Sequence, residues 1–249
     1  MVVLTLLTTG RQLDRLSAAI PAPHEVLRVS SVNETCAVLR ERPVDVLVMD
    51  PAVGNSLPRV AASAAELFRI GIEFPYLPVV FYASNAAKAL PLIARFPSRE
   101  HCDALVADAD DGPEGVCAAI ESALNSSLAG RLLRGLQIAA DEIPPSLCRA
   151  LREVFTHPGF FRTADDIANS ACMSRRTLDR WLARCALVSG GELLQVAKAL
   201  VAVRLERDGL LGRDGVRRVC GLSAGVKVGM FVARATRSRH EELVQASDV

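Results

Sequence analysis

Four arginines and one aspartate crowd into a short segment in the last third of the chain, at a spacing that suits one face of a helix. They are Arg175, Arg176, Asp179, Arg180 and Arg184. Leu178, Leu182 and Cys185 recur between them with the period of an opposite, inward face. A guanidinium donates paired hydrogen bonds to a guanine edge, worth about 1–3 kcal/mol of discrimination, and it also pairs with phosphate. A carboxylate accepts from cytosine N4. These residue types predict a surface that suits double-stranded DNA.

The residues in front of this segment predict a short helix, a tight turn and the start of a second helix. Thr163, with Asp166 three residues later, is typical of a capping box, and Ile167 and Ala168 would be the buried residues of the short helix. Ser174 would cap the arginine-bearing helix after a short turn. Together these elements make a helix-turn-helix, whose second helix enters the major groove of DNA.

Two side chains of the second helix each have an alternative role. Asp179 could serve as the i,i+4 partner of Arg175 on the helix surface instead of reading a base. Trp181 is predicted to fill a seam between helices in preference to stacking on a base. Arg175 and Arg184 are interpreted as phosphate contacts, which position a protein on DNA without specifying sequence.

This segment resembles the DNA-binding domain of the AraC/XylS family. The family has a Leu-Ala pair in its first helix and then a Ser-x-x-x-Leu-x-Arg-x-Phe run. The matching residues here are Ile167, Ala168, Ser174, Leu178, Arg180 and Leu182. The resemblance continues through the sequence RLER at 204–207, in a predicted linker helix, and covers about residues 145–242. It implies that Arg176, Asp179 and Arg180 face the bases.

The resemblance also implies a second helix-turn-helix. Its first helix would be residues 216–220, and its turn Gly221-Leu222-Ser223 stands where the family has Gly-Phe-Ser. The next helix departs from the family, because Gly225 and Gly229 each lower helix stability by about 1 kcal/mol relative to Ala. Its outward positions hold Gly225, Val226, Lys227 and Met230. The residues interpreted as phosphate contacts are Arg217, Arg218 and Lys227. We therefore expect the first helix-turn-helix to read bases and the second only to clamp the backbone or to pack.

The first half of the chain alternates apolar runs, typical of buried strands, with helix-like stretches. The strand candidates are residues 2–8, 25–30, 44–50, 77–83 and 102–108. Five strand–helix units predict a doubly wound α/β domain over residues 1–128. In such domains function lies at the carboxyl ends of the strands.

Asp50 ends the third of these strands, and residues 1–128 resemble a response-regulator receiver domain. The resemblance implies a phosphoacceptor at Asp50, Mg²⁺ held by acids after the first strand, a hydroxyl residue ending the fourth strand and a lysine after the fifth. The chain has TTGRQ, Ala83 followed by Ser84, and Asp108 in those places. We therefore expect a pseudo-receiver that is not phosphorylated, in which Asp50 caps the turn before Pro51. Dimerisation, contact with another protein and binding of a small ligand remain open as its use.

Residues 129–144 are predicted to be a helical linker to an all-α domain over residues 145–249. An apolar stripe enters this linker from the preceding helix, through Leu124, Leu128, Leu132 and Leu136. The Pro144–Pro145 pair ends it. The stripe could be a dimer seam, or it could pack against its own domain.

The charge is divided unevenly along the chain. Residues 1–128 carry 10 basic and 15 acidic side chains, a net charge of −5, and residues 129–249 carry 19 and 13, a net charge of +6. The basic half is the candidate for binding a polyanion. The seven cysteines form no CxxC pair and histidines number only four, so we expect reduced thiols, no metal and no cofactor. No apolar run is long enough to span a bilayer, and we expect a cytoplasmic protein.

These patterns predict a sequence-specific DNA-binding transcription regulator. No enzyme is indicated, because the sequence has no nucleophile–base pairing, phosphate-cradling glycine loop or metal spacing. The expected partners are double-stranded DNA, a second copy of the chain, and RNA polymerase or another regulator, without a membrane. Two alternatives stay open: a protein-interaction or assembly factor with a decayed DNA-binding module, and a response regulator switched by phosphorylation of Asp50.

Overall fold

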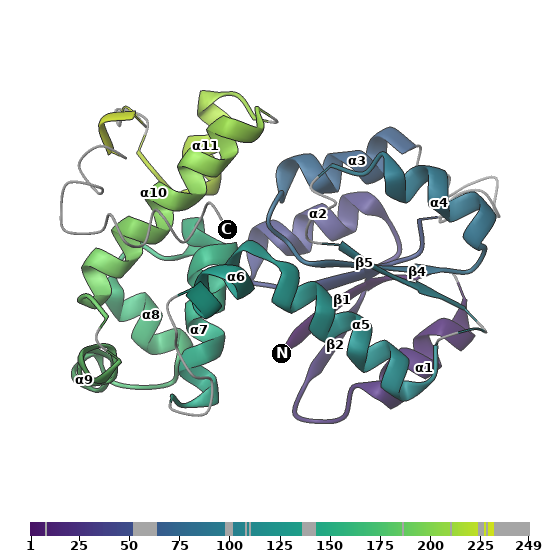
Figure 1. Ribbon diagram of the computed structural model, residues 1–249, viewed down its shortest axis with the longest axis horizontal. Coiled ribbons are helices and arrows are strands. Elements are labelled where there is room, and N and C mark those ends of the chain that lie inside the picture. The colour runs from purple at the N-terminus through teal and green to yellow at the C-terminus, as the bar shows by residue number, and fades with distance from the viewer. Residues whose placement is uncertain are drawn as a thin grey trace. The chain divides into compact units, whose positions relative to one another are not determined.

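The chain divides into two compact units, residues 1–127 and 128–249, hereafter the N-terminal and C-terminal units (Figure 1). The computed structural model describes residues 1–7, 9–51, 64–97, 102–107, 109, 111–135, 143–185, 187–209, 211–223, 227 and 229–231. None of the helices in this described part of the chain is long and apolar enough to cross a membrane.

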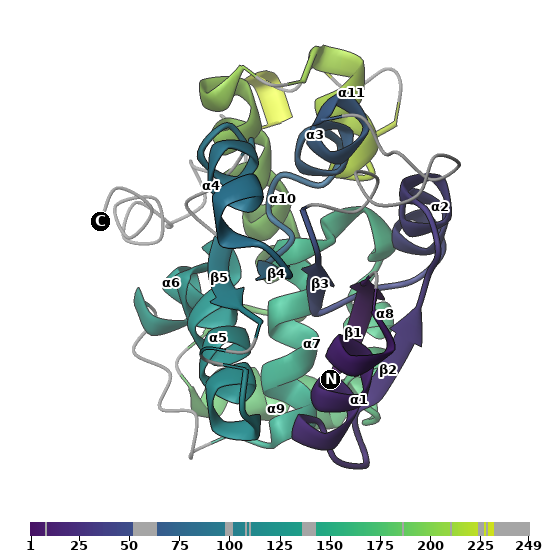
Figure 2. The same cartoon turned by 90° about the vertical axis from the view of Figure 1, so that its right-hand side faces the viewer.

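The N-terminal unit is a doubly wound α/β domain, as predicted. Its strands are β1 (Val2–Leu6), β2 (Glu25–Arg28), β3 (Val46–Met49), β4 (Val79–Ala83) and β5 (Cys102–Val106). All neighbours pair in parallel in the order β2-β1-β3-β4-β5, and Figure 2 shows them side by side in this order. The helices are α1 (Gly10–Ala19), α2 (Val32–Glu41), α3 (Ala64–Glu73), α4 (Ala86–Ala94) and α5 (Pro113–Ser126). Strand order and helix alternation are those of the receiver and flavodoxin type of fold.

Two apolar clusters fill the faces of this sheet, because alternate residues of a strand point to opposite sides. Leu4, Leu47 and Phe81 pack on the face that α2 and α3 cover, whereas Val48 and Tyr82 pack on the face of α1 and α5 (Figure 1). Every residue of β3 and β4 is buried. This two-sided burial explains why both strands read as uninterrupted apolar runs.

A buried polar network fastens α1 and the start of α5 to β4. The hydroxyl of Tyr82 donates to Asp111 Oδ2 at 2.7 Å, and Arg15 forms an ion pair with the same carboxylate. Asp111 is only 5 % exposed. Burial, together with the hydrogen bond to Asp111, raises the pKa of Tyr82.

The helix that ends the N-terminal unit does not run on into the C-terminal unit. The stripe through Leu124 and Leu128 predicted one helix, but α5 ends at Ser126 and α6 (Leu128–Gly135) begins after a break. Ser127 is extended there, with φ −61° and ψ 157°, and its hydroxyl donates to the Leu124 carbonyl at 2.6 Å. Serine hydroxyls compete with the backbone ladder in this way, which is why they favour helix ends. The remainder of the predicted linker, residues 136–142, lies outside the described residues.

The regular elements in the described part of the C-terminal unit are all helices. After α6 come α7 (Pro145–Thr156), the 3-10 helix η3 (Pro158–Phe160), α8 (Ala164–Ser170), α9 (Arg175–Arg184), α10 (Gly190–Asp208) and α11 (Arg213–Val219). The long helix α10 contacts α7, η3, α8, α9 and α11 and is therefore the centre of the unit. An all-helical C-terminal region was the second half of the predicted fold class.

Candidate nucleic-acid interface

Helix α8 begins with the capping box that the sequence predicted. The carboxylate of Asp166 accepts from the backbone N–H groups of Arg162 and Thr163, both at 2.8 Å. These bonds, that of Thr163 above all, hold the pKa of Asp166 below its ordinary value. The helix is short and buries Ile167 and Ala168, 0 % and 2 % exposed, on its inner side.

The turn after α8 is tight and contains a left-handed residue. Cys172 has a φ of +53°, the sole positive φ of a non-glycine residue in the described chain. Its N–H donates to the Asn169 carbonyl at 3.0 Å, and the next N–H, that of Met173, donates to Ala168 at 2.9 Å. Ser174 then caps α9 by accepting from the N–H of Thr177 at 3.2 Å. The chain is thereby turned within four residues from one helix into the next.

Helix α9 presents the two faces that its spacing predicted. Leu178 and Leu182 are 0 % and 1 % exposed on the inner face, whereas Arg176, Arg180 and Arg184 are exposed on the outer one. Within the described residues neither Arg176 nor Arg180 forms an ion pair. Two cations without an acidic partner in the described part of the chain thus lie on the outer face of the second helix, where an anionic partner can reach them.

The other charged residues of α9 are held by neighbours. Arg175 Nε donates to both oxygens of Asp179 at 3.1 and 3.0 Å, and its guanidinium also lies 3.7 Å from Asp165 of α8. Asp179 therefore forms the i,i+4 ion pair with Arg175 that was the alternative to reading a base. The guanidinium of Arg184 lies 5.2 Å from the centre of the Trp181 ring, a cation–π arrangement. Trp181 is half-buried. This exposure does not decide between filling a seam between helices and stacking on a base.

One residue at which α10 packs closely on α8 and α9 was missed by the sequence reasoning. A Cβ on Gly190, the first residue of α10, would lie 2.9 Å from the Ala164 side chain and 3.3 Å from that of Leu178. Gly190 lets α10 contact both helices closely, so a side chain there would push them apart. The Gly190–Gly191 pair after a serine cap was the available signal, but it indicates only a helix start.

Helix α11 and the turn after it lie where the sequence predicted the first part of a second helix-turn-helix. Arg218 is exposed, and Arg217 forms an ion pair with Asp214. The turn passes through Gly221 at a φ of +61°, where a Cβ would lie 2.9 Å from the Cα of Gly159 in η3. Glycine is required here both for the left-handed backbone and for the close approach.

Beyond this turn only a few residues are described. Lys227 is exposed, and residues 229–231 are helical, with the N–H of Phe231 donating to the Lys227 carbonyl at 3.0 Å. Met230 is 69 % exposed. Gly225 and Val226, which the sequence placed on the outward face, lie outside the described residues.

Asp50 of the N-terminal unit is enclosed at the carboxyl end of β3. Its side chain is 0 % exposed, and its Oδ2 accepts from the Ser84 N–H at 3.3 Å and lies 3.4 Å from Gln12 Nε2. Gln12 also donates to the carbonyl of Tyr82 at 2.9 Å. These contacts link Asp50 to α1 and to the end of β4, and the cap on the turn before Pro51 stays a prediction. Asp108, the other acid considered for this pocket, lies outside the described residues.

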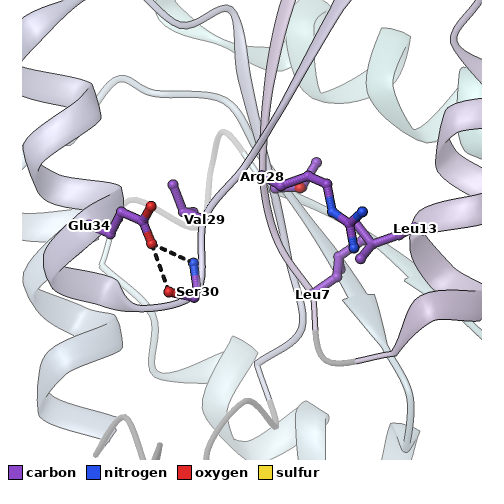
Figure 3. Close-up of a pocket in the computed structure, with 7 residues that line it drawn as sticks. Leu7, Leu13, Arg28, Val29, Ser30 and Glu34 are labelled. Atoms are coloured by element: carbon purple, nitrogen blue, oxygen red, sulfur yellow. Dashed lines mark hydrogen bonds between the residues drawn. The ribbon is translucent and has the colours of Figure 1, made fainter.

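A cavity of about 280 Å³ lies at the carboxyl ends of β1 and β2 (Figure 3). It is lined by Thr5, Leu7, Leu13, Arg28, Val29, Ser30 and Glu34. Glu34 accepts from the N–H and hydroxyl of Ser30 at 2.7 and 2.8 Å, and these bonds lower its pKa. Arg28 points to the other side, toward Leu7 and Leu13 (Figure 3). The cavity is slightly smaller than small-molecule sites usually are, about 300–1,000 Å³.

No protein-family model matches this chain, and no curated protein matches it either. Two arrangements in the described residues bear on its function. One is the cationic outer face of α9 and the other is the enclosed carboxylate of Asp50.

Proposed function

We propose that this protein is a sequence-specific DNA-binding transcription regulator whose C-terminal unit is of the AraC/XylS type. One observation carries the proposal. In the α8–turn–α9 arrangement the second helix buries two leucines and exposes Arg176 and Arg180, two cations without an ion-pair partner among the described residues. In a helix-turn-helix the second helix is the one that enters the major groove, so this is the face that would meet base edges.

The dimensions of α9 suit this role. An α-helix with its side chains is about 10–12 Å across, and the major groove is about 12 Å wide, so a ten-residue helix such as α9 can lie in the groove. Arg176 and Arg180 are one helical turn apart, so they can reach successive base pairs. We assign base contacts to these two residues.

The neighbouring charges are assigned to positioning. Arg175 is shared between Asp179 and Asp165 and is therefore not assigned to a base; it would become a phosphate contact at the helix edge by exchanging one of these carboxylates for a phosphate. Arg184, over the Trp181 ring, is placed at the other end of α9 and is also assigned to phosphate. Asp179 holds the Arg175 side chain in place. It lies on the same face of α9 as Arg176 and Arg180, where its negative charge would repel a phosphate group.

For the N-terminal unit we propose a pseudo-receiver. A phosphorylated aspartate needs acidic residues that hold Mg²⁺ against the new charge. In the described part of the turn after β1, which is Leu7 and Thr9–Arg11, there is no acid. Asp50 is also fully buried and engaged by the Ser84 N–H. Both observations favour a structural carboxylate over a phosphoacceptor.

The test is selection of sites from a randomised DNA duplex pool by the purified full-length chain, at two salt concentrations. The proposal expects an enriched motif and an affinity that falls steeply with salt, because lysines and arginines displace counterions from phosphate. Arg180→Ala should weaken binding to the enriched motif much more than binding to random DNA. Arg11→Ala, an exposed arginine of α1, is the matched control and should change neither. An absence of binding at both salt concentrations would contradict the proposal.

A further inference from the structure

The C-terminal unit contains the same turn twice, 49 residues apart. In the first turn the N–H of Ala171 donates to Ile167 at 3.0 Å, and in the second that of Cys220 donates to Val216 at 3.0 Å. The two bonds that complete each turn correspond as well. Their donor–acceptor pairs are Cys172–Asn169 (3.0 Å) and Gly221–Arg218 (3.1 Å), followed by Met173–Ala168 (2.9 Å) and Leu222–Arg217 (2.8 Å).

The backbone and the buried residues repeat with the same offset. The left-handed positions are Cys172, with φ +53°, and Gly221, with φ +61°. The inward residues Ile167 and Val216 are both 0 % exposed. Helix α11 with its turn is therefore a second copy of α8 with its turn. We call α8–α9 the first repeat and α11 with the residues after it the second repeat. Helix α10, about 28 Å long, joins them.

The cations lie on different helices in the two repeats. In the first repeat, α8 has the sequence ADDIANS without a cation, and the arginines are on α9. In the second repeat, α11 has the sequence RDGVRRV with three arginines. In the sequence, the residues 49 positions after Arg175, Arg176, Asp179 and Arg180 are Ala224, Gly225, Val228 and Gly229, none of which has a polar side chain. In the second repeat the arginines thus lie on the first helix, and beyond the turn Lys227, which corresponds to Leu178, is the cation among the described residues.

The two helices of a helix-turn-helix meet different parts of DNA. The second helix lies in the major groove, and the first crosses the phosphate backbone. Alanine, glycine and valine side chains have no hydrogen-bond donor or acceptor, so they cannot make the bidentate contacts that distinguish base pairs. Arginines on the first helix can bind phosphates, which gives affinity without sequence.

We infer that the DNA target contains one base-specific block, read by α9, next to a stretch of any sequence that α11 holds by its phosphates. The inference rests on the proposed function and adds the form of the target and the division of labour between the repeats. Arg218 is the central residue of the second contact, because it is exposed while Arg217 is paired with Asp214. The affinity of the protein for its target then depends on the length of the flanking DNA beside the block and not on the sequence of that flanking DNA.

The test uses the full chain and duplexes built on the selected motif. One series randomises the flanks on both sides, and another shortens each flank in turn. Randomised flanks should leave the affinity unchanged, and shortening one flank should weaken it. A motif with two blocks about 10–10.5 base pairs apart would overturn the inference, because both repeats would then read bases. Equal affinity for all flank lengths would also overturn it, since α11 would then not touch DNA.

Two variants separate the repeats. Arg218→Ala should weaken binding to selected and random duplexes by the same factor and should reduce the slope of log affinity against log salt by about 0.9. Arg180→Ala should lose about 5- to 150-fold in preference for the block, the range for one bidentate base contact. A changed base preference in Arg218→Ala would refute the division. Failure of the proposed function is distinguishable, because no duplex of any length or sequence would then be retained.

Discussion

The contact between Gly159 and Gly221 gives the sharpest test of how the second repeat is built. Replacing Gly221 by alanine perturbs two things at once. The residue has a φ of +61°, and its Cβ would lie 2.9 Å from Gly159 Cα and 3.0 Å from Gly159 O. Both are backbone atoms, which cannot rotate away as the end of a side chain can.

The magnitude follows from these two terms. A left-handed backbone costs an L-residue about 1–2 kcal/mol, and overpacking of a tight contact costs about 1–3 kcal/mol more. Gly221→Ala should therefore lower the free energy of unfolding of the C-terminal unit by about 2–5 kcal/mol. Gly209→Ala is a matched control, because Gly209 has a φ of +64° with nothing within 4 Å of its Cβ position. Gly209→Ala should lower the free energy of unfolding only by the cost of the left-handed backbone, about 1–2 kcal/mol.

The chain supplies its own probe for this measurement. Trp181 is its single tryptophan and lies on α9, so urea unfolding followed by tryptophan fluorescence reports the C-terminal unit. The two glycine variants should differ by about 1–3 kcal/mol, the overpacking term. Gly159→Ala changes the other residue of this contact, and its Cβ would lie 2.8 Å from the Val219 carbonyl oxygen. It should lower the free energy of unfolding by the overpacking cost, about 1–3 kcal/mol. Equal losses in Gly209→Ala and Gly221→Ala would refute the reasoning, because the close approach would then carry no energy.

Three further predictions concern single carboxylates and their partners. The pKa of Asp166 is held below its ordinary value of 3.8, so its stabilising effect is complete above that value and is lost as the pH falls through the lower, folded-state pKa. Asp166→Asn should therefore cost about 0.5–1 kcal/mol at pH 7 and less at pH 3, by Trp181 fluorescence, and a cost independent of pH would argue against the capping role. Asp50→Asn should change nothing in labelling by acetyl phosphate with Mg²⁺, because the parent chain should take up no label; stoichiometric label that the substitution removes would show that the pseudo-receiver assignment is wrong. Tyr82→Phe removes the hydroxyl bound to buried Asp111 and should destabilise the N-terminal unit by about 1–3 kcal/mol, by far-ultraviolet circular dichroism; an unchanged unfolding midpoint would contradict the network.

The sheet could be predicted because its signal is local. Residues 44–50 and 77–83 read as continuous apolar runs, and their strands are buried on both faces. The caps of α8 and α9 were equally readable, since Thr163 and Ser174 bond within their own first turns. Where a structural cause lies within a few residues, the sequence contains it.

The parts that could not be predicted depend on contacts between distant residues. Gly190 reads as a helix start, and only the packing shows that it makes room for Ala164 and Leu178. Lys198 carries a charge that would ordinarily lie in solvent, yet it is 6 % exposed on α10, and burial lowers its pKa. The left-handed φ of Cys172 is likewise set by the turn and not by a residue type that favours it.

The packing of the second repeat bears on whether it is a decayed module. A DNA-binding repeat that no longer bound DNA could also lose its packing. Here, however, Val216 and Cys220 are 0 % exposed, and Gly221 packs against the backbone of Gly159 in η3. Helix α11 also packs on α10, which contacts every helix of the first repeat. The scaffold is therefore part of the core that positions α9, whatever the next helix contacts. This coupling explains how base-reading groups could be absent from one repeat while its turn is kept in full.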